Sequence, residues 1–237
     1  MKNIIKILIL SLFIVVYTSC DTDVLNEVPR DSFSPDNLYA NTSGFKAATA
    51  TLYSNVRSER SGREWLPSMM TGTDVSNGGN TFRDIIPLTT YGAALTPSFE
   101  PARLWWNLGY QTISYSNLII EKAQDSNIDW DNPNDPLIFT AEAKFFRAYY
   151  HNLLTNLFND IPLADEFYTQ PKLDFTRSPQ KQVLEFIKED LIFASENLPD
   201  NPASVENGKL TSWAALHLLT EVYLHLGEYA LAESTAK

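Results

Sequence analysis

The stretches Ala141–Tyr150, AEAKFFRAYY, and Leu157–Leu163, LFNDIPL, decide the fold of this 237-residue chain. Apolar side chains recur at helical spacing through the first stretch and beyond it, which predicts a helix over residues 136–158. The segment Asn159-Asp160-Ile161-Pro162 ends that helix, because proline cannot continue the helical hydrogen bonding. The apolar stripe of this helix consists of Phe146, Tyr150, Leu153 and Leu157.

On both sides of this helix the sequence predicts further helices, so the expected fold class is all-α. A capping side chain followed by proline marks three helix starts, since the Ser or Asp oxygen accepts from free N–H groups and proline suits the first helical position. These starts are Ser34-Pro35, Asp135-Pro136 and Ser178-Pro179. Apolar residues on two faces of the helix over 102–123 are typical of a buried helix. The expected helices cover residues 35–57, 102–123, 136–158, 180–198 and 211–226, and another begins near Tyr229.

The last part of the chain has the pattern of a tetratricopeptide repeat, in which two helices pack against each other. An earlier unit is split: helix 136–158 supplies its first half and helix 180–198 its second, with an insertion between them. The expected fold is therefore a tetratricopeptide-repeat-like helical superhelix with a long irregular loop insertion. The positions that match the repeat are Leu216, Leu219, Tyr223, Gly227, Tyr229 and Ala232.

Residues 58–100 form the longest stretch without helical periodicity. Glycines and prolines, among them Gly62, Pro67, Gly78 and Pro87, interrupt any long element there. Long ordered loops are more often functional than other segments. We therefore expect a functional surface in this part of the chain.

The N-terminus has the features of a lipoprotein signal peptide. A basic start precedes the apolar run Ile7–Tyr17, which is shorter than the roughly 20 residues that span a bilayer as a helix. Cys20 is the only cysteine, follows a small residue and is the expected site of lipid attachment. Residues 1–19 would be removed, and residues 20–33 would form a tether. The alternative is an ordinary secretory signal in which Cys20 is incidental.

Composition and charge exclude several classes of function. Without residues 1–19 the chain keeps 16 basic and 29 acidic side chains, a formal net charge of −13. This excess of acid disfavours nucleic acid and anionic lipid headgroups as partners, because both require clustered Lys and Arg. A lone cysteine provides neither a disulfide framework nor a thiolate metal site.

In this order the motifs resemble those of SusD/RagB-like nutrient-binding lipoproteins, over essentially the whole chain. The helix from Ala141 and its LFNDIPL end are similar to the signature helix of that family. The other matching motifs are Trp105…Tyr110…Ile113…Asn117, Glu189-Asp190-Leu191…Ala194…Leu198-Pro199 and Gly208-Lys209…Ala214-Ala215-Leu216…Val222-Tyr223-Leu224.

The resemblance implies an all-α lipoprotein. Its lipid would anchor it on the outer face of a Gram-negative outer membrane. Members of the family bind glycans, or less often peptides, and sit as a lid on a SusC-like TonB-dependent transporter. They are not enzymes, and no cofactor or metal is implied. Since family members are usually much longer, we expect residues 34–237 to be an N-terminal helical domain that is incomplete at its C-terminus.

A sugar ligand needs flat aromatic faces against its C–H surfaces and planar amide, carboxylate or guanidinium groups for its hydroxyls. The stretch 58–100 offers these types of side chain. The alternative is that Trp65 and Tyr91 pack the loop onto the helices, and for the tandem Trp105-Trp106 core packing is the favoured interpretation. The candidate ligand-binding residues are Trp65, Asp74, Asn77, Asn80, Arg83 and Tyr91.

Catalysis has less support in the sequence. His151, His217 and His225 lie on expected helices, and we interpret each as a core or surface histidine. The sequence contains no H-E-x-x-H arrangement, nucleophile elbow or glycine-rich phosphate loop. Two alternatives stay open: a tetratricopeptide scaffold that binds protein partners only, and a glycoside hydrolase, for which no pair of carboxylates stands out.

Overall fold

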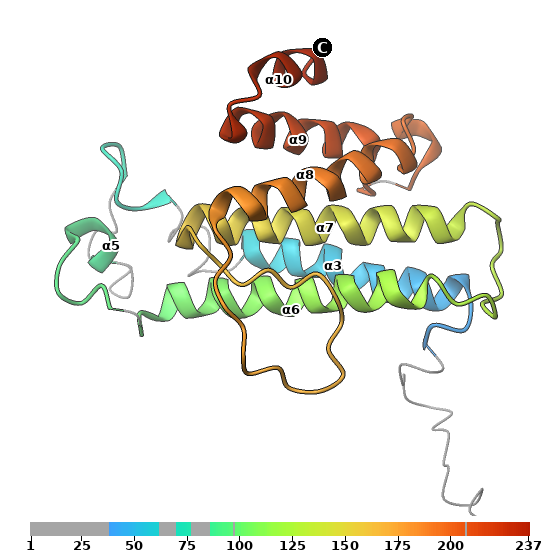
Figure 1. The fold of residues 1–237 in the computed structure, drawn as a ribbon, viewed down its shortest axis with the longest axis horizontal. Helices are drawn as coiled ribbons and strands as arrows, with labels where there is room; N and C mark the ends of the chain where they lie inside the picture. The colour runs from blue at the N-terminus through green and yellow to red at the C-terminus, as the bar shows by residue number, and fades with distance from the viewer. Residues whose placement is uncertain (1–37, 62–69, 77–85, 97, 207) are drawn as a thin grey trace, which may run out of the picture. The chain divides into compact units, whose positions relative to one another are not determined.

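The computed structural model describes residues 38–61, 70–76, 86–96, 98–206 and 208–237 (Figure 1). Residues 38–237 form one compact unit, and the regular secondary structure of its described part is helical apart from two isolated bridges. The expected all-α, tetratricopeptide-like fold class is confirmed. Within the described residues no helix is both long and apolar enough to cross a membrane. The elements are α3 (Thr42–Ser61), α5 (Ile86–Thr90), α6 (Glu100–Lys122), α7 (Asp135–Phe158), α8 (Gln180–Asn197), the 3-10 turn η3 (Pro202–Ser204), α9 (Ser212–Leu226) and α10 (Tyr229–Thr235).

Helix α7 is the centre of the unit. It lies against α3 and α6 on one side and against α8 on the other, and α9 and α10 follow α8 in succession (Figure 1). Burial on opposite faces explains why α7 lacks one clear polar side, and fully buried alanines let its neighbours approach closely. These alanines are Ala141, Ala143 and Ala148.

Helices α6 and α7 come closest where Gly109 faces Leu154. A Cβ atom at Gly109 would lie 2.8 to 3.0 Å from three carbons of the Leu154 side chain, closer than real Cβ contacts. A side chain at this position would therefore force the fully buried Leu154 to shift. Fully buried members of the hydrophobic core include Phe45, Leu52, Ile113, Tyr150, Ile187 and Leu191.

The repeat pattern is realised by two helix pairs, α7 with α8 and α9 with α10. Gly227 ends α9 with a φ of 77°, and the N–H of Glu228 donates to the carbonyl of Tyr223 at 2.8 Å. Glycine adopts this left-handed conformation without steric cost, which explains its place in the repeat. Of the predicted repeat positions, Leu219, Tyr223 and Ala232 are buried, whereas Leu216 is half-buried and Tyr229 is exposed.

Four of the five expected long helices lie within two residues of their predicted bounds, but the first does not. It begins at Thr42, where the Asn41 side chain accepts a hydrogen bond from the Gly44 N–H at 3.1 Å. The N–H of Asp129 donates to the carbonyl of Ala40, so the preceding backbone pairs with a distant loop and not with a helical neighbour. The predicted start at Ser34-Pro35 lies outside the described residues.

Two predicted caps are also wrong. The oxygen that caps α8 belongs to Asp160, which accepts from the Gln180 N–H at 2.9 Å, while the Ser178 N–H bonds to the carbonyl of Ile161. The carboxylate of Asp135 accepts from the Thr42 hydroxyl at 2.8 Å and so joins α7 to α3. At α8 an oxygen from another segment thus replaces the local cap, whereas at α7 no side chain caps the helix.

Candidate functional site

The stretch 58–100 is less irregular than expected, because α3 extends through Ser61 and α5 forms over Ile86–Thr90. Of the candidate ligand-binding residues the structure describes two, Asp74 and Tyr91, and both are exposed. The other candidates, Trp65, Asn77, Asn80 and Arg83, lie outside the described residues, as does Cys20.

Tyr91 joins two parts of this loop. Its hydroxyl donates to the carbonyl of Gly72 at 2.6 Å, and the N–H of Gly72 donates to the carbonyl of Ser76 at 3.1 Å. The resulting turn contains Asp74 and therefore lies next to Tyr91. Because the ring of Tyr91 remains 70% exposed, the side chain ties the loop to itself and keeps an aromatic surface open to solvent.

The backbone of the same loop is strained at Tyr91. Tyr91 has a φ of 50°, which a non-glycine residue rarely adopts, and Gly72 has a φ of 87°. A Cβ atom at Gly72 would lie 2.4 Å from the carbonyl oxygen of Leu88. Such strain persists only where the surroundings hold it, and it is concentrated at binding sites.

An apolar pocket of about 280 Å³ lies beside this loop, between α5 and the ends of α6 and α7. Trp105 contributes to its wall although its side chain is almost fully buried, so the expected core packing of Trp105 is confirmed. Trp106 is half-buried and packs against the rings of Tyr110 and Phe158. The pocket is lined by Leu88, Leu95, Phe99, Pro101, Ala102, Trp105, Leu157 and Phe158.

Sequence reasoning missed this pocket. Leu157 belongs to the predicted core stripe of α7, but it is 42% exposed at the pocket wall, whereas Phe146 and Tyr150 of the same stripe are buried. The only signal was the presence of Leu88, Leu95 and Phe99 in a segment without helical periodicity. That signal does not distinguish a pocket lining from loop residues that pack on the core.

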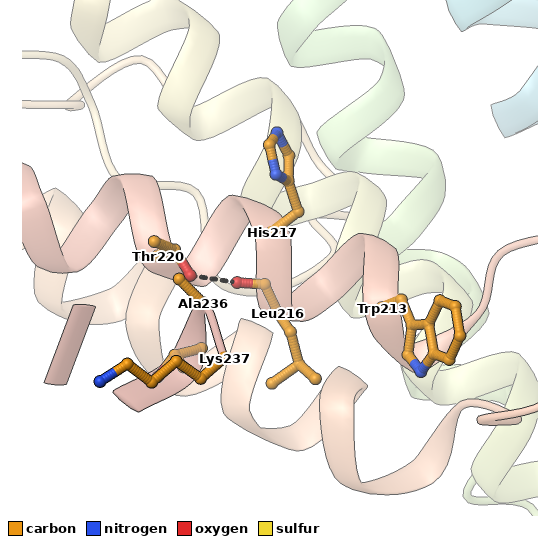
Figure 2. Close-up of a pocket in the computed structure, with 7 residues that line it drawn as sticks. Trp213, Leu216, His217, Thr220, Ala236 and Lys237 are labelled. Atoms are coloured by element: carbon orange, nitrogen blue, oxygen red, sulfur yellow. Dashed lines mark hydrogen bonds between the residues drawn. The ribbon is translucent and has the colours of Figure 1, made fainter. Parts of the chain in front are cut away.

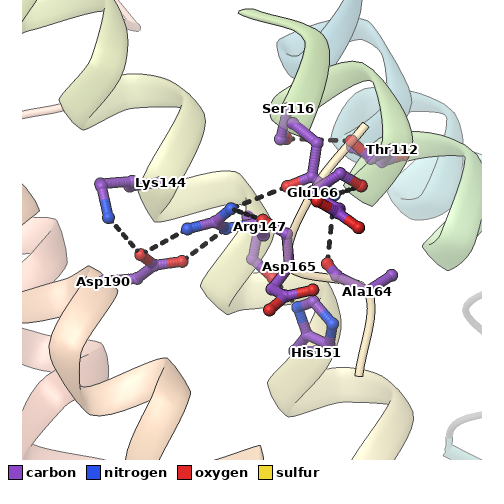
Figure 3. A network of polar contacts seen from close by, with 10 residues as sticks. Thr112, Ser116, Lys144, Arg147, His151, Ala164, Asp165, Glu166 and Asp190 are labelled. Carbon is purple, nitrogen blue, oxygen red and sulfur yellow. Dashed lines mark hydrogen bonds and ion pairs between the residues drawn. The ribbon is translucent and has the colours of Figure 1, made fainter. Parts of the chain in front are cut away.

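A buried polar network lies further along α7, around Arg147 (Figure 3). The Arg147 guanidinium forms a two-point ion pair with Asp190 on α8, at 2.7 and 2.8 Å. Lys144 adds a third contact to the same carboxylate at 2.7 Å. Arg147 Nη1 donates to the side-chain oxygen of Asn117 and to the carbonyl of Asp165, both at 2.8 Å. Each of the three guanidinium nitrogens thus meets an acceptor, as a buried charge requires.

This network holds the segment between α7 and α8, residues 159–179, which we call the strap. Asn117 on α6 donates to the carbonyls of Ala164 and Glu166 at 3.1 and 2.9 Å, and Tyr110 donates to the carbonyl of Pro162 at 2.7 Å. The strap, drawn in yellow-orange in Figure 1, therefore crosses α6 on fixed contacts. The predicted motif Trp105…Tyr110…Ile113…Asn117 supplies two of the three side chains that hold it.

The buried titratable groups are part of the helix packing. Burial lowers the pKa of His151 to about 4, and its Nδ1 is bonded to the carbonyl of Arg147. Burial raises the pKa of Glu142, which accepts from Tyr53 at 2.9 Å, and that of Glu59, which accepts from Tyr149 at 2.8 Å. His151 is thus a core histidine, and His217 and His225 are on the surface, as predicted.

A second hollow of about 450 Å³ lies between α9 and α10 (Figure 2). Its wall includes Trp213, which is 62% exposed, together with the repeat position Leu216 and the exposed His217. In the described ranges, no group of three or more His, Cys, Asp or Glu side chains could hold a metal ion.

A family model described as starch-binding and associating with the outer membrane matches residues 31–224. This match covers most of the chain, from before α3 to the end of α9. The chain belongs to the SusD-like family. The family identified from the sequence motifs is thereby confirmed.

Several SusD-like proteins are similar to the chain along nearly all of its length. A SusD-like protein of Bacteroides ovatus is 23% identical over 92% of the chain and 39% of its own length. The SusD-like protein P2 of Formosa agariphila is 26% identical over 90% of the chain and 42% of its own length. The chain therefore spans about two fifths of the length of the curated relatives it matches.

Solved SusD-like structures have the same helical arrangement. A laminarin-binding SusD-like protein superimposes with a TM-score of 0.70 at 26% identity, over 83% of the chain and 43% of the solved chain. A SusD-like protein from Bacteroides fragilis superimposes with a TM-score of 0.72 at 22% identity, over 88% and 40% of the two chains. The second comparison supports the fold alone.

Proposed function

We propose that this chain is the N-terminal part of a cell-surface lipoprotein that binds a glycan and passes it to a SusC-like TonB-dependent transporter. The observation that carries the proposal is the family match over residues 31–224, because its description joins starch binding to the outer membrane. A relative that binds laminarin adds support for a saccharide ligand.

The exposed loop around Tyr91 fits a saccharide. An aromatic ring that is 70% exposed provides a stacking surface for sugar C–H groups, and the neighbouring turn presents the carboxylate of Asp74 for hydroxyls. The positive φ of Tyr91 and the bond from its hydroxyl to the carbonyl of Gly72 give this surface a defined shape before ligand binds. Trp65, Asn77, Asn80 and Arg83 remain proposed contributors on the same loop.

Attachment to the membrane follows from the N-terminal sequence. Removal of residues 1–19 would leave Cys20 to carry the lipid, with residues 20–33 as a tether to the helical domain of residues 34–237. Several acyl chains on one cysteine anchor a protein almost irreversibly, where a single chain does not. The anchor would hold the binding loop near a transporter in the same membrane.

The role is binding and not catalysis. In the described part of the chain, the buried carboxylates Glu59 and Glu142 accept hydrogen bonds from Tyr149 and Tyr53 within the helical core. Neither lines the apolar pocket beside the Tyr91 loop. This arrangement gives no support to a pair of carboxylates placed on either side of a glycosidic bond.

Calorimetry of the full-length lipoprotein with oligosaccharides of laminarin, xyloglucan and starch, and with peptides, tests the proposal. We expect binding of a saccharide without product, and Tyr91→Ala to weaken it about tenfold through loss of ring contacts. Tyr229→Ala is the matched control, because Tyr229 is equally exposed at 70% on α10. Binding to no saccharide would leave the protein-scaffold alternative, and product formation would establish a glycoside hydrolase.

A further inference from the structure

Side chains from three distant parts of the chain meet beside the connection between α8 and α9, residues 198–211. The Tyr53 hydroxyl of α3 donates to Glu142 Oε1 of α7 at 2.9 Å, and the Lys209 ammonium lies 3.4 Å from the same oxygen. The Tyr53 hydroxyl also accepts a hydrogen bond from the Leu210 N–H at 3.0 Å. We call these four residues the latch, because they tie the connection to α3 and α7.

The ring of Tyr53 contacts Lys209 as well. Lys209 Nζ lies 4.6 Å from the centre of this ring, and the ring itself packs edge to face against Phe146 of α7 with centroids 4.8 Å apart. The ammonium of Lys209 therefore contacts a carboxylate and an aromatic face at the same time. Both contacts are lost together when the connection moves away from α3.

The carboxylate of Glu142 is hydrogen-bonded through only one of its oxygens. Glu142 is 4% exposed, and among the described residues its Oε2 has no hydrogen-bond partner. The neighbouring Thr49 hydroxyl donates instead to the carbonyl of Phe45 at 2.9 Å. Burial raises the pKa of Glu142, and the Lys209 ammonium opposes that rise. Lys209 is therefore the counter-ion on which the charge of Glu142 depends.

The buried ion pair of Asp190 differs in this respect. Arg147 and Lys144 together donate to both oxygens of the Asp190 carboxylate. A buried carboxylate oxygen without a hydrogen bond costs free energy, so the closed latch is held by a smaller margin than the pair of Arg147 and Asp190. Opening is therefore easier at the latch than at this second network.

The latch lies next to the start of α9. Ser212, the first residue of α9, donates its N–H to the carbonyl of Pro199 at 2.9 Å and so brings the two ends of the connection together. Within the connection, the Lys209 N–H donates to the carbonyl of Glu206 at 3.0 Å, which is a local bond. Helix α9 packs against α8 and α10. The latch thus adds a link from α3 and α7 to the start of the second helix pair, α9 with α10.

We propose that the latch controls local opening of the connection 198–211 from α3 and α7, and that the ion pair of Lys209 with Glu142 holds it closed. Opening frees the Leu210 N–H and moves Lys209 away, while the helices around Arg147 keep their packing. Local openings of this kind require less free energy than global unfolding. The inference goes beyond the proposed function, since it involves neither a saccharide nor a transporter.

Hydrogen exchange of the full-length lipoprotein, measured by mass spectrometry on a peptide over residues 205–212, reports on the Leu210 N–H. We expect Lys209→Met to speed this exchange about tenfold at pH 7, because the buried carboxylate loses its counter-ion and the connection opens more often. Addition of Glu142→Gln should return the exchange toward the wild-type rate. A neutral amide needs no counter-ion, and its oxygen still accepts from Tyr53.

Two controls show whether the opening is local and specific. Lys181→Met, which changes an exposed lysine of α8, should leave the exchange of the peptide 205–212 at the wild-type rate. A second peptide over residues 145–152 of α7, around Arg147, should keep its wild-type protection in every variant.

Three results would overturn the inference. Equal exchange of the peptide 205–212 in the wild type and Lys209→Met would mean that the latch does not hold the connection. Faster exchange of both peptides in Lys209→Met would mean that Lys209 stabilises the whole helical unit and not the connection alone. Faster exchange that Glu142→Gln does not reverse would show that the ion pair is not what keeps the connection closed.

Discussion

Arg147 on α7 and Asp190 on α8 form a two-point ion pair that is almost fully buried, with Nε 2.7 Å from Oδ2 and Nη2 2.8 Å from Oδ1. The same guanidinium holds the strap through Asp165 and orients Asn117. One side chain therefore couples the packing of a repeat unit to the position of its insertion.

Removal of one partner of this pair should destabilise the chain strongly. We expect Arg147→Met to lower the free energy of unfolding by up to about 3–5 kcal/mol, because the buried Asp190 then keeps only Lys144 as an ionic partner. The double variant with Asp190→Leu should lose less than the sum of the single changes, as urea denaturation of all four proteins would measure. Additive losses would contradict direct coupling. Glu100→Gln, in the exposed pair with Arg103, should leave the urea midpoint unchanged.

Asn117 should hold the strap against α6 and so slow its opening. Asn117→Ala removes both donors to the carbonyls of Ala164 and Glu166, and at about 1 kcal/mol per lost bond the two losses together favour strap opening about thirtyfold. We expect trypsin to cut after Lys172 or Arg177 correspondingly faster under native conditions. Gln111→Ala, on an exposed position of the same helix, should leave the cutting rate unchanged. An unchanged rate in Asn117→Ala would mean that other contacts hold the strap.

At the crossing of α6 and α7, one substitution should change the free energy of unfolding in opposite directions, depending on whether Leu154 is present. Gly109→Ala should destabilise the wild type, since overpacking costs about 1–3 kcal/mol and the gain in helix propensity returns at most about 1 kcal/mol. In a Leu154→Ala background the same change should stabilise the chain, because the carbons that its Cβ would meet are gone. Urea denaturation of the four proteins measures both effects. The same sign in both backgrounds would refute the contact.

His151 should make stability depend on pH. Its pKa is lowered to about 4 by burial, so the unfolded chain takes up a proton below its ordinary pKa of 6.5 while the folded chain does not. Stability contributed by the neutral ring is therefore complete above about pH 6.5 and is lost as pH falls toward 4, by about 2 kcal/mol between pH 7 and pH 5.

The measurement for this prediction is a comparison with His151→Gln. Glu59 and Glu142 have raised pKa values, so their contribution to stability grows as pH falls and opposes that of His151. Because both carboxylates remain in the variant, the difference in unfolding free energy between the two proteins isolates His151. A difference that stays constant from pH 7 to pH 5 would show that the ring does not exclude its proton.

Much of the fold could be predicted from the sequence. The bounds of α6, α7, α8 and α9 agree with prediction within two residues, since apolar spacing and nearby Pro or Gly are local signals. The first helix was predicted to run through residues 39–41, but Asn41 caps α3 there and the backbone before it pairs with the loop at Asp129. A local pattern does not reveal such a partner.

Less of the candidate site could be predicted. The residue types on the loop around Asp74 and Tyr91 suggested a sugar ligand, but the bond from Tyr91 to Gly72 joins positions 19 apart. The role of Arg147 was hidden, because within AEAKFFRAYY it looks like an ordinary polar position on a helix. Its partner Asp190 is 43 positions away and Asn117 is 30 positions away.

By itself the sequence determined the helical class, the split repeat and the family, because each depends on spacing along the chain or on motifs in order. Only the tertiary structure decided how the strap is anchored, which leucines are buried and which, like Leu173, face solvent. The physical reason is the distance along the chain over which the interactions act. Helix periodicity arises from neighbours three and four residues apart, whereas burial and buried ion pairs depend on which distant segments meet when the core forms.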